Sequence, residues 1–196
     1  MAKGTIYRVY FRRRREGRTD YRLRKRLISS RIPRLVIRRS LKHTYLQVVE
    51  AKIEGDRVIA CASTAELAKF GWKAGTGNVP AAYLAGYLAG KRAIARGVAK
   101  AIVDINGYGV TKSNRILSAM KGAIDAGLDI PHSEEVLPEE DRLKGTQIAE
   151  YASLLQSNDP AKYQRTFSAY LKKSLPPEVI VEHFASVKEA IEKEVK

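Results

Sequence analysis

Residues 79–96 read VPAAYLAGYLAGKRAIAR, and this stretch decides the fold. Its first half is apolar on nearly every side, which predicts a helix that is largely buried. Pro80 suits the first helical position, after Asn78 or Val79, and Gly97 suits the position just beyond the last turn. We therefore expect one long buried helix over about residues 80–96.

Three short runs before this helix have the composition of β-strands: residues 35–39, 45–49 and 57–62. The short spacing between them favours an antiparallel meander. Residues 101–105, a continuous apolar run after the helix, suit a buried parallel strand. The sequence therefore predicts an α/β fold, with a small mixed sheet (an antiparallel three-strand meander plus one parallel strand) flanked by helices.

Further helices are expected on both sides of this core. Thr19-Asp20 has the composition of an N-cap for a short helix over residues 21–28, and Ser113 or Asn114 caps another that ends at Gly127. Asp159 and Pro160 open a helix in a helical, peripheral C-terminal region, which closes on an amphipathic helix. We divide the chain into a basic N-terminal arm with its short helix (1–32), an α/β core (33–135) and a helical C-terminal extension (136–196).

The net charge is concentrated at one end of the chain. The first 42 residues hold 16 Lys and Arg against two acids, Glu16 and Asp20, a net charge of +14 out of +15 for the whole chain. Residues 1–18 show no hydrophobic period, so we expect an extended arm that becomes ordered on binding. A guanidinium is costly to desolvate without an anion, and its planar fork suits phosphate. A polyanion is the expected partner.

RNA is the polyanion that the pattern favours. Tyr7, Tyr10, Phe11 and Tyr21 are interleaved with the cations, and aromatic rings stack on unpaired bases. No helix-turn-helix or zinc finger precedes the sheet, so groove readout of DNA is disfavoured. The candidate RNA-binding residues come from the arm, the first helix and strand, and the loop before the long helix: Arg8, Arg12, Arg13, Arg14, Arg15, Arg18, Tyr21, Arg22, Arg24, Lys25, Arg26, Arg34, Arg38, Arg39, Lys42, His43, Trp72, Lys73 and Asn78.

Two of these assignments depend on side-chain direction. Period two along the first strand places Arg34, Val36 and Arg38 on one face, which would extend the basic surface onto the sheet. Trp72 lies in a glycine-rich loop, where it is either a core plug or an RNA-stacking group, and both interpretations stay open.

Several enzyme-like signals fail on inspection. The run from Gly86 to Lys91 is one residue short of a phosphate-binding loop, and its small residues more plausibly let the helix approach the sheet. Residues 104–109 (DINGYG) begin like a calcium loop, but Tyr108 and Arg115 occupy ligand positions five and twelve. We expect no catalytic residue, no metal and no cofactor.

Other classes of function are less favoured. The alternative is a metal-dependent nuclease on a ribonuclease-H-like sheet, in which Asp104 is joined by a second carboxylate such as Glu66 or Asp125. A membrane-surface protein is a third interpretation of the basic arm, although no run is long enough to span a bilayer. The single cysteine, Cys61, favours a reducing, cytoplasmic compartment.

Several runs also resemble a known family. They are residues 7–17 (YRVYFRRRREG), 20–24 (DYRLR), 33–36 (PRLV), 71–73 (GWK) with Asn78, 80–83 (PAAY) and, most specific, 120–133 (MKGAIDAGLDIPHS). Over about residues 1–155 the chain resembles archaeal members of the universal large-subunit ribosomal protein eighteen family, which binds 5S rRNA. Residues 156–196 depart from that family, and their shortness relative to the eukaryotic extension favours an archaeal source.

The resemblance implies a noncatalytic role in the large ribosomal subunit. The protein would attach 5S rRNA to the large-subunit rRNA in the central protuberance, beside neighbouring large-subunit proteins. It would have no membrane and no small-molecule substrate among its partners. The resemblance places the RNA contacts on the basic arm and on the basic residues beside the sheet, with residues 71–73 and Asn78 as weaker candidates.

Overall fold

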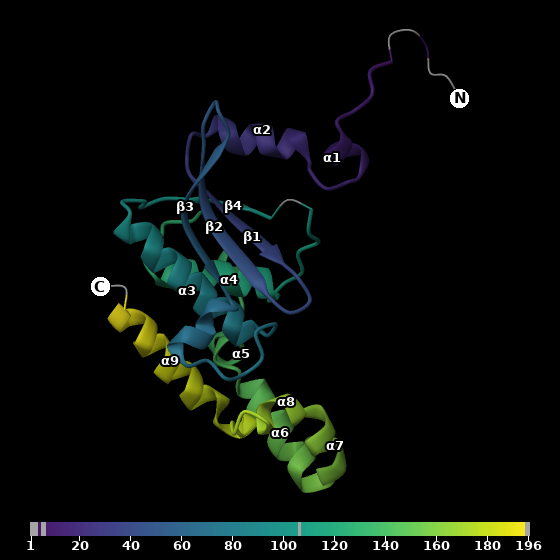
Figure 1. The fold of residues 1–196 in the computed structure, drawn as a ribbon, viewed down its shortest axis with the longest axis vertical. Helices are drawn as coiled ribbons and strands as arrows, with labels where there is room; N and C mark the ends of the chain where they lie inside the picture. Colours follow the sequence, from purple (N-terminus) through teal and green to yellow (C-terminus); the bar gives the residue numbers. More distant parts are fainter. Residues whose placement is uncertain (1–3, 5–6, 106, 195–196) are drawn as a thin grey trace.

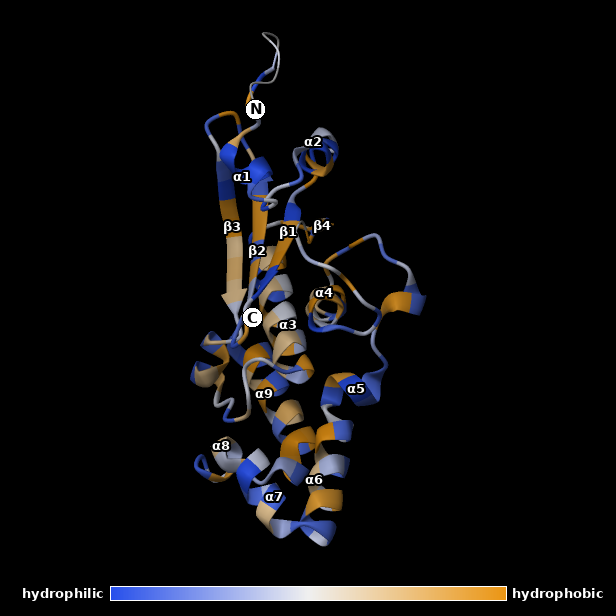
Figure 2. Ribbon diagram, turned by 90° about the vertical axis from the view of Figure 1, so that its right-hand side faces the viewer, coloured by the Kyte–Doolittle hydropathy of each residue, from blue (hydrophilic) through white to orange (hydrophobic). Residues whose placement is uncertain are grey.

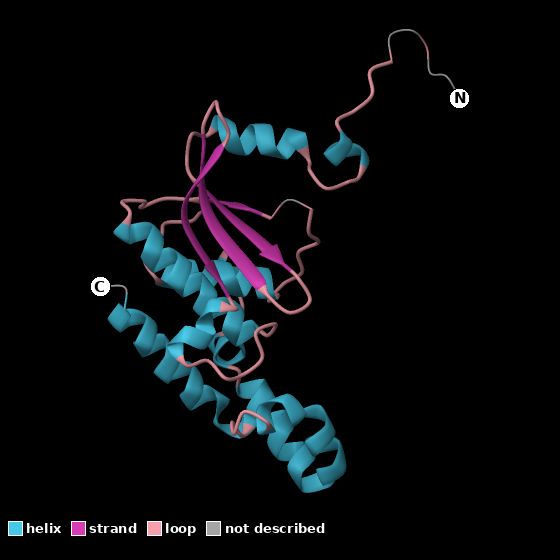
Figure 3. Ribbon diagram, viewed as in Figure 1, coloured by secondary structure: helices cyan, strands magenta, loops and turns pink. Residues whose placement is uncertain are grey.

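The computed structural model describes residues 4, 7–105 and 107–194 (Figure 1). Within these residues, one mixed sheet has the strand order β3-β2-β1-β4. Its strands are β1 (Arg34–Arg39), β2 (Thr44–Ala51), β3 (Asp56–Ser63) and β4 (Ile102–Asp104). The meander β1-β2-β3 is antiparallel and β4 runs parallel to β1, so the predicted sheet is confirmed (Figure 3).

Two helices cover one face of this sheet. The long helix α3 (Val79–Ala95) packs against β2 and β3, and α4 (Arg115–Asp125) packs against β1. Along β2, Leu46 and Val48 are fully buried while Tyr45 is 47% exposed, because successive side chains of a strand point to opposite faces. Hydrophobic colouring accordingly covers much of β2 and α4 (Figure 2).

Glycines allow α3 and α4 to pack with their backbones almost in contact. A Cβ added at Gly86 would collide with the backbone carbonyl of Ala119, and one at Gly122 would collide with the carbonyl of Tyr83. A Cβ at Gly90 would lie 2.7 Å from the Ala126 Cβ. We expected the small residues of α3 to let this helix approach the sheet. That expectation is wrong, because the glycines of α3 face α4 instead.

The predicted helix ends are confirmed where side chains cap them. Asp20 accepts hydrogen bonds from the backbone N–H groups of Arg22 and Leu23 at the start of α2 (Tyr21–Ser29). Asn78 caps α3, and Asn114 caps α4 through the N–H groups of Ile116 and Leu117. Gly97 takes φ = +81° just beyond α3, a conformation that glycine adopts without steric cost.

The arm differs from its prediction at one point. Residues 12–15 form a single helical turn, α1 (Arg12–Arg15), instead of extended chain. Arg15 N–H donates to the Phe11 carbonyl, and the Arg12 guanidinium lies 3.3 Å from the Glu16 carboxylate one turn later. A single turn needs no hydrophobic period, so periodicity could not reveal it. Residues 1–3 and 5–6 of the predicted arm lie outside the described residues.

The C-terminal region is helical, as predicted, but its last helix is not peripheral. The helices are α5 (Glu140–Lys144), α6 (Thr146–Asn158), α7 (Pro160–Thr166), α8 (Ser168–Leu171) and α9 (Ile180–Glu194), with 3₁₀ turns η1 (Glu66–Phe70), η2 (Glu134–Val136) and η3 (Pro177–Val179). Ile180, Phe184, Val187 and Ile191 of α9 belong to the same buried cluster as α3. The expected single helix after Pro160 is divided at Phe167 into α7 and α8.

Candidate nucleic-acid interface

The arginines of α1 are all exposed, and hydrophilic colouring covers this turn (Figure 2). Neighbouring side chains orient two of them. Arg14 lies over the Tyr10 ring, 3.9 Å from its centroid, and Arg13 Nε donates to Thr19 Oγ1 at 2.9 Å. The rings of Phe11 and Tyr21 lie 5.4 Å apart, which joins the arm to the start of α2. The structure thus brings cations and aromatic rings together on the arm, as predicted.

The helix α2 buries none of its residues. Arg22, Lys25 and Arg26 are exposed, as are Arg8 and Arg18 on the arm. Arg24 is different, because its guanidinium lies 2.9 Å from a carboxylate oxygen of Asp56 at the start of β3. This ion pair connects α2 to the sheet. It also means that Arg24, one of the predicted RNA-binding cations, already has a carboxylate partner.

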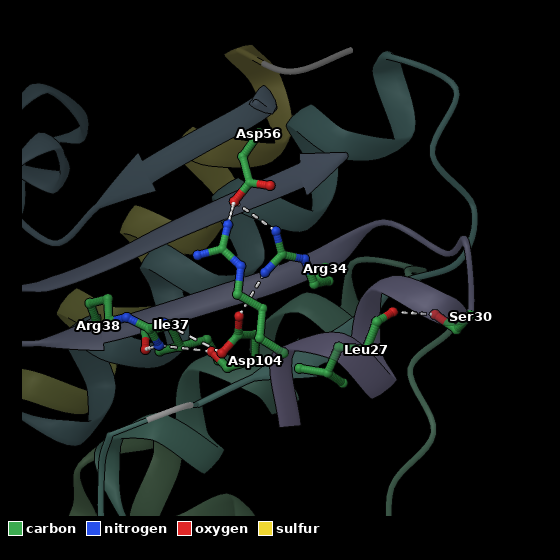
Figure 4. Close-up of polar contacts among 8 residues, drawn as sticks. Leu27, Ser30, Arg34, Ile37, Arg38, Asp56 and Asp104 are labelled. Atoms are coloured by element: carbon green, nitrogen blue, oxygen red, sulfur yellow. Dashed lines mark hydrogen bonds and ion pairs between the residues drawn. The ribbon is translucent and has the colours of Figure 1, made fainter. Parts of the chain in front are cut away.

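Arg34 sits between two carboxylates inside the protein. Its guanidinium lies 2.8 Å from Asp56 Oδ2 and 3.0 Å from Asp104 Oδ2, with a side chain only 3% exposed (Figure 4). Asp104 also accepts from Arg38 through its carboxylate and its backbone carbonyl. The prediction that Arg34 extends an outer basic surface is therefore wrong, because burial and ion pairing make it a structural residue.

The remaining predicted cations of this region lie at the opposite end of β1 from α2 (Figure 1). Arg39 and Lys42 are exposed, and Arg38 and His43 are half-buried. The imidazole of His43 meets the edge of the Tyr45 ring at a centroid distance of 6.3 Å. The candidate residues thus form two groups, one on α1 and α2 and one at the β1–β2 turn.

The loop before α3 resolves the open question about Trp72. This side chain is 3% exposed, donates from Nε1 to the Gly75 carbonyl and stacks on His183 of α9 at 5.1 Å. It is a core plug, and the prediction of an RNA-stacking Trp72 is corrected. Asn78 is spent on capping α3 and on a 3.4 Å contact with the Tyr170 hydroxyl, whereas Lys73 is exposed.

The carboxylates of the nuclease alternative do not assemble a site. Asp104 is held by Arg34 and Arg38, Glu66 pairs with Arg92 at 2.7 Å, and Asp125 pairs with Lys121 at 2.8 Å while accepting from the Tyr83 hydroxyl. Among the described residues, no group of three or more His, Cys, Asp or Glu could hold a metal ion. The second carboxylate expected beside Asp104 is therefore replaced by guanidinium groups.

Some cations beside these groups were not selected from the sequence. Arg31 follows α2, while Lys112 and Arg115 flank the capping residue of α4. In the sequence these cations are marked only by their position next to a helix end. An analysis of hydrophobic periodicity does not detect such a position. No helix in the described part of the chain is long and apolar enough to cross a membrane.

The fold and the interface define a class: a small α/β protein with a helix-backed mixed sheet and an exposed arginine-rich arm suited to bind a polyanion. Residues 5–99 match the family of ribosomal large-subunit proteins 60S L5 and 50S L18. This match supports a large-subunit ribosomal protein of the L5/L18 type, and with it rRNA binding.

The match covers the arm, α2, the β1–β3 meander and α3. The matched family is one of ribosomal proteins, which implies rRNA and other ribosomal proteins as partners. Residues 120–133, on which the resemblance drawn from the sequence depended most, lie outside the matched region and stay a prediction, as does an archaeal source.

Proposed function

We propose that this protein binds 5S rRNA and attaches it to the large-subunit rRNA in the central protuberance of cytoplasmic ribosomes. The 5S RNA is inferred from the sequence resemblance, and the family supports it at the coarser level of a large-subunit protein. In this proposal residues 1–32 supply most RNA contacts, residues 33–135 hold them in place, and residues 136–196 face neighbouring ribosomal proteins.

One observation carries the proposal. Four consecutive arginines occupy one exposed turn of α1, with no buried residue in that turn or in α2. Such a turn gains nothing from the apolar core and is held only by contacts within the arm, so a partner that binds its arginines would add to its free energy of ordering. Phosphates supply that partner, and shape with a few stacked bases supplies the specificity.

The test is a truncation. Deletion of residues 1–18 should abolish tight binding to 5S rRNA in a filter-binding assay while the body stays folded, because the core residues lie outside the deleted segment. Circular dichroism and the fluorescence of Trp72, the single tryptophan, check the fold.

A charge variant separates arginine from chain length. Replacement of all four α1 arginines by glutamine should weaken 5S binding nearly as much as the deletion. The matched control replaces Lys172 and Lys173, beside α8, by glutamine and should bind as wild type. Unchanged affinity in the truncated protein would overturn the proposal, and equal loss with any RNA of that length would reduce it to nonspecific binding.

A further inference from the structure

The turn between β1 and β2 and the loop after β4 enclose a hollow of about 380 Å³, lined by Arg39, Ser40, Leu41, Tyr108 and Arg115. This size lies within the range of small-ligand sites, roughly 300–1,000 Å³. In the sequence, Tyr108 and Arg115 drew attention only because they occupy two ligand positions of a calcium loop and cannot serve as its ligands. Neither belongs to the predicted RNA-binding set.

The charge of the hollow has one sign. Arg39 and Arg115 are its charged lining residues, and no acid is among them. Its nearest carboxylate in the sequence, Asp104, is buried and already held by Arg34 and Arg38. The hollow therefore offers cations to a ligand without a competing carboxylate.

A second hollow, of about 280 Å³ between α3, α4, α5 and α9, provides the contrast. There Lys121 pairs with Asp125 and Lys144 pairs with Glu140, each at 2.9 Å or less. Two of its three lining lysines are thus paired with carboxylates of the same hollow. The comparison singles out the β1–β2 hollow as the one of the two that is suited to an anion.

The hollow also contains an aromatic ring that lies close to two cations. The Tyr108 ring lies 5.8 Å from the Arg38 guanidinium and 5.9 Å from that of Arg39. The ring is half-buried and packs against the main apolar cluster. Beside it, Leu41 is 95% exposed, which is unusual for a leucine and gives the hollow an apolar rim. An aromatic face, an apolar rim and two arginines match a base, a ribose and a phosphate.

The walls are held in place before any ligand arrives. Arg115 Nη1 donates to the Gly77 carbonyl at 2.7 Å, and the Thr76 hydroxyl donates to the Lys42 carbonyl at 2.8 Å. The turn itself closes through the Ser40 N–H and the His43 carbonyl at 2.7 Å. A preformed site loses less entropy on binding than a mobile one.

One wall of the hollow lies on a loop that reaches the arm. A Cβ added at Gly107 would lie 3.6 Å from the Arg18 carbonyl, so the loop that carries Tyr108 passes beside the end of the arm. An RNA strand that leaves the arm can therefore continue to the hollow. This continuity favours a nucleotide within RNA over a free mononucleotide.

We propose that this hollow binds one unpaired nucleotide of rRNA, with its base stacked on Tyr108 and its phosphate between Arg39 and Arg115. The inference rests on the proposed function in taking RNA as the ligand, but it does not require that the RNA be 5S. It assigns RNA contacts to Tyr108 and Arg115, which lie outside residues 5–99, the matched family region.

The test compares Tyr108→Leu, which keeps apolar packing but removes stacking, with Tyr108→Phe, which keeps the ring. The probes are 5S rRNA and a mixed-sequence single-stranded RNA of about ten nucleotides. We expect Tyr108→Leu to weaken binding of both probes by about tenfold and Tyr108→Phe to stay within about twofold. Tyr151→Leu, a 45% exposed tyrosine of α6, is the matched control and should bind as wild type.

A charge variant and a cross-link address the phosphate and the base. Arg39→Gln should lower the slope of log affinity against log salt by about one, whereas Lys172→Gln should leave it unchanged. RNA carrying 5-bromouridine should form a photo-cross-link at Tyr108, located by mass spectrometry. Thermal unfolding of each variant confirms that the fold is intact.

The outcomes separate the two proposals. If wild-type protein shows no preference for 5S rRNA but its oligonucleotide binding depends on Tyr108, the 5S assignment fails and the hollow stands. If Tyr108→Leu binds both probes like wild type, or if Tyr108→Phe loses as much as Tyr108→Leu, the stacking site is wrong. If adenosine monophosphate binds as tightly as RNA, the ligand of the hollow is a free nucleotide and not a nucleotide within RNA, and the proposal is overturned.

Discussion

At the residue scale, the buried ion pairs of Arg34 replace a predicted RNA contact. The alternation of β1 placed Arg34 and Arg38 on one face correctly, and their register on β2 agrees with it. One partner of Arg34 is 70 residues away in the sequence at Asp104, on a strand that pairs with β1 only in the folded sheet. Period two predicts a direction, but it does not reveal a carboxylate brought there by a crossover.

Removal of that carboxylate should destabilise the protein. Asp104→Ala leaves the buried Arg34 guanidinium with Asp56 alone, and loss of one partner from a buried pair typically costs about 3–5 kcal/mol. Because Asp56 remains, we expect a loss near the lower end, about 3 kcal/mol, in urea unfolding. Glu66→Ala breaks a more exposed pair and should cost less than about 1 kcal/mol. A loss below 1 kcal/mol for Asp104→Ala would mean that Asp56 alone suffices.

His183 should make stability depend on pH. Burial lowers the pKa of this imidazole, and the nearby positive charge of Lys73 lowers it further by a smaller amount. The imidazole Nε2 accepts a hydrogen bond from the backbone N–H of Lys73 at 3.0 Å. The unfolded chain then takes up a proton before the folded one does. Stability is therefore complete above the ordinary histidine pKa of about 6.5 and declines as the pH falls below it.

Trp72 provides the measurement, since it is the single tryptophan and stacks on His183. The urea midpoint followed by Trp72 fluorescence should fall between pH 7.5 and pH 5.5 in wild type. In His183→Gln this pH-dependent part should be missing, because glutamine does not titrate. An equal fall in both proteins would assign the pH dependence to other groups.

At the element scale, α3 shows what the sequence can and cannot predict. Its apolar circumference and its cap at Asn78 predicted a buried helix with nearly correct ends. Its partner helix was not predicted, since small residues permit close approach to any neighbour. The packing of α9 into the main core was not predicted, for a related reason. The apolar stripe at Ile180, Phe184 and Val187 predicts an amphipathic helix, but it does not indicate which surface covers that stripe.

The α3–α4 contact gives a sharp prediction. Gly86→Ala places a methyl group against the Ala119 carbonyl, so the two helix backbones must separate, and overpacking of this kind costs about 1–3 kcal/mol. Gly109→Ala is the control, because no atom lies within 4 Å of the added Cβ. Thermal unfolding of both variants should show a clear drop for the first alone. Equal melting temperatures would show that α3 and α4 separate freely.

At the scale of the whole molecule, nearly all excess charge lies in the first 42 of the 196 residues. Residues beyond 42 contribute only +1 of the net +15, so the folded body is close to neutral. Composition alone predicted this division, and the structure adds that two of the arm-proximal cations, Arg24 and Arg34, are already paired internally. Charge counting overestimates the cations available to RNA because it cannot see such pairs.

Binding should be strongly salt dependent as a result. If about six to ten phosphates are neutralised, affinity for 5S rRNA should fall by about 10³–10⁵ between 50 and 200 mM salt. Filter binding over a salt series with the full chain gives the slope. A nearly flat dependence would show that stacking or apolar contacts dominate instead of phosphates.

Asp56 has a consequence for how RNA is captured. Its carboxylate is shared by Arg24 of α2 and Arg34 of β1, and α2 has no buried side chain that would otherwise fix it to the body. An incoming phosphate at Arg24 competes with Asp56 for the same guanidinium, so one anion is exchanged for another. Arg24 can therefore exchange Asp56 for an RNA phosphate without becoming unpaired. Asp56 stays paired as well, because its ion pair with Arg34 remains.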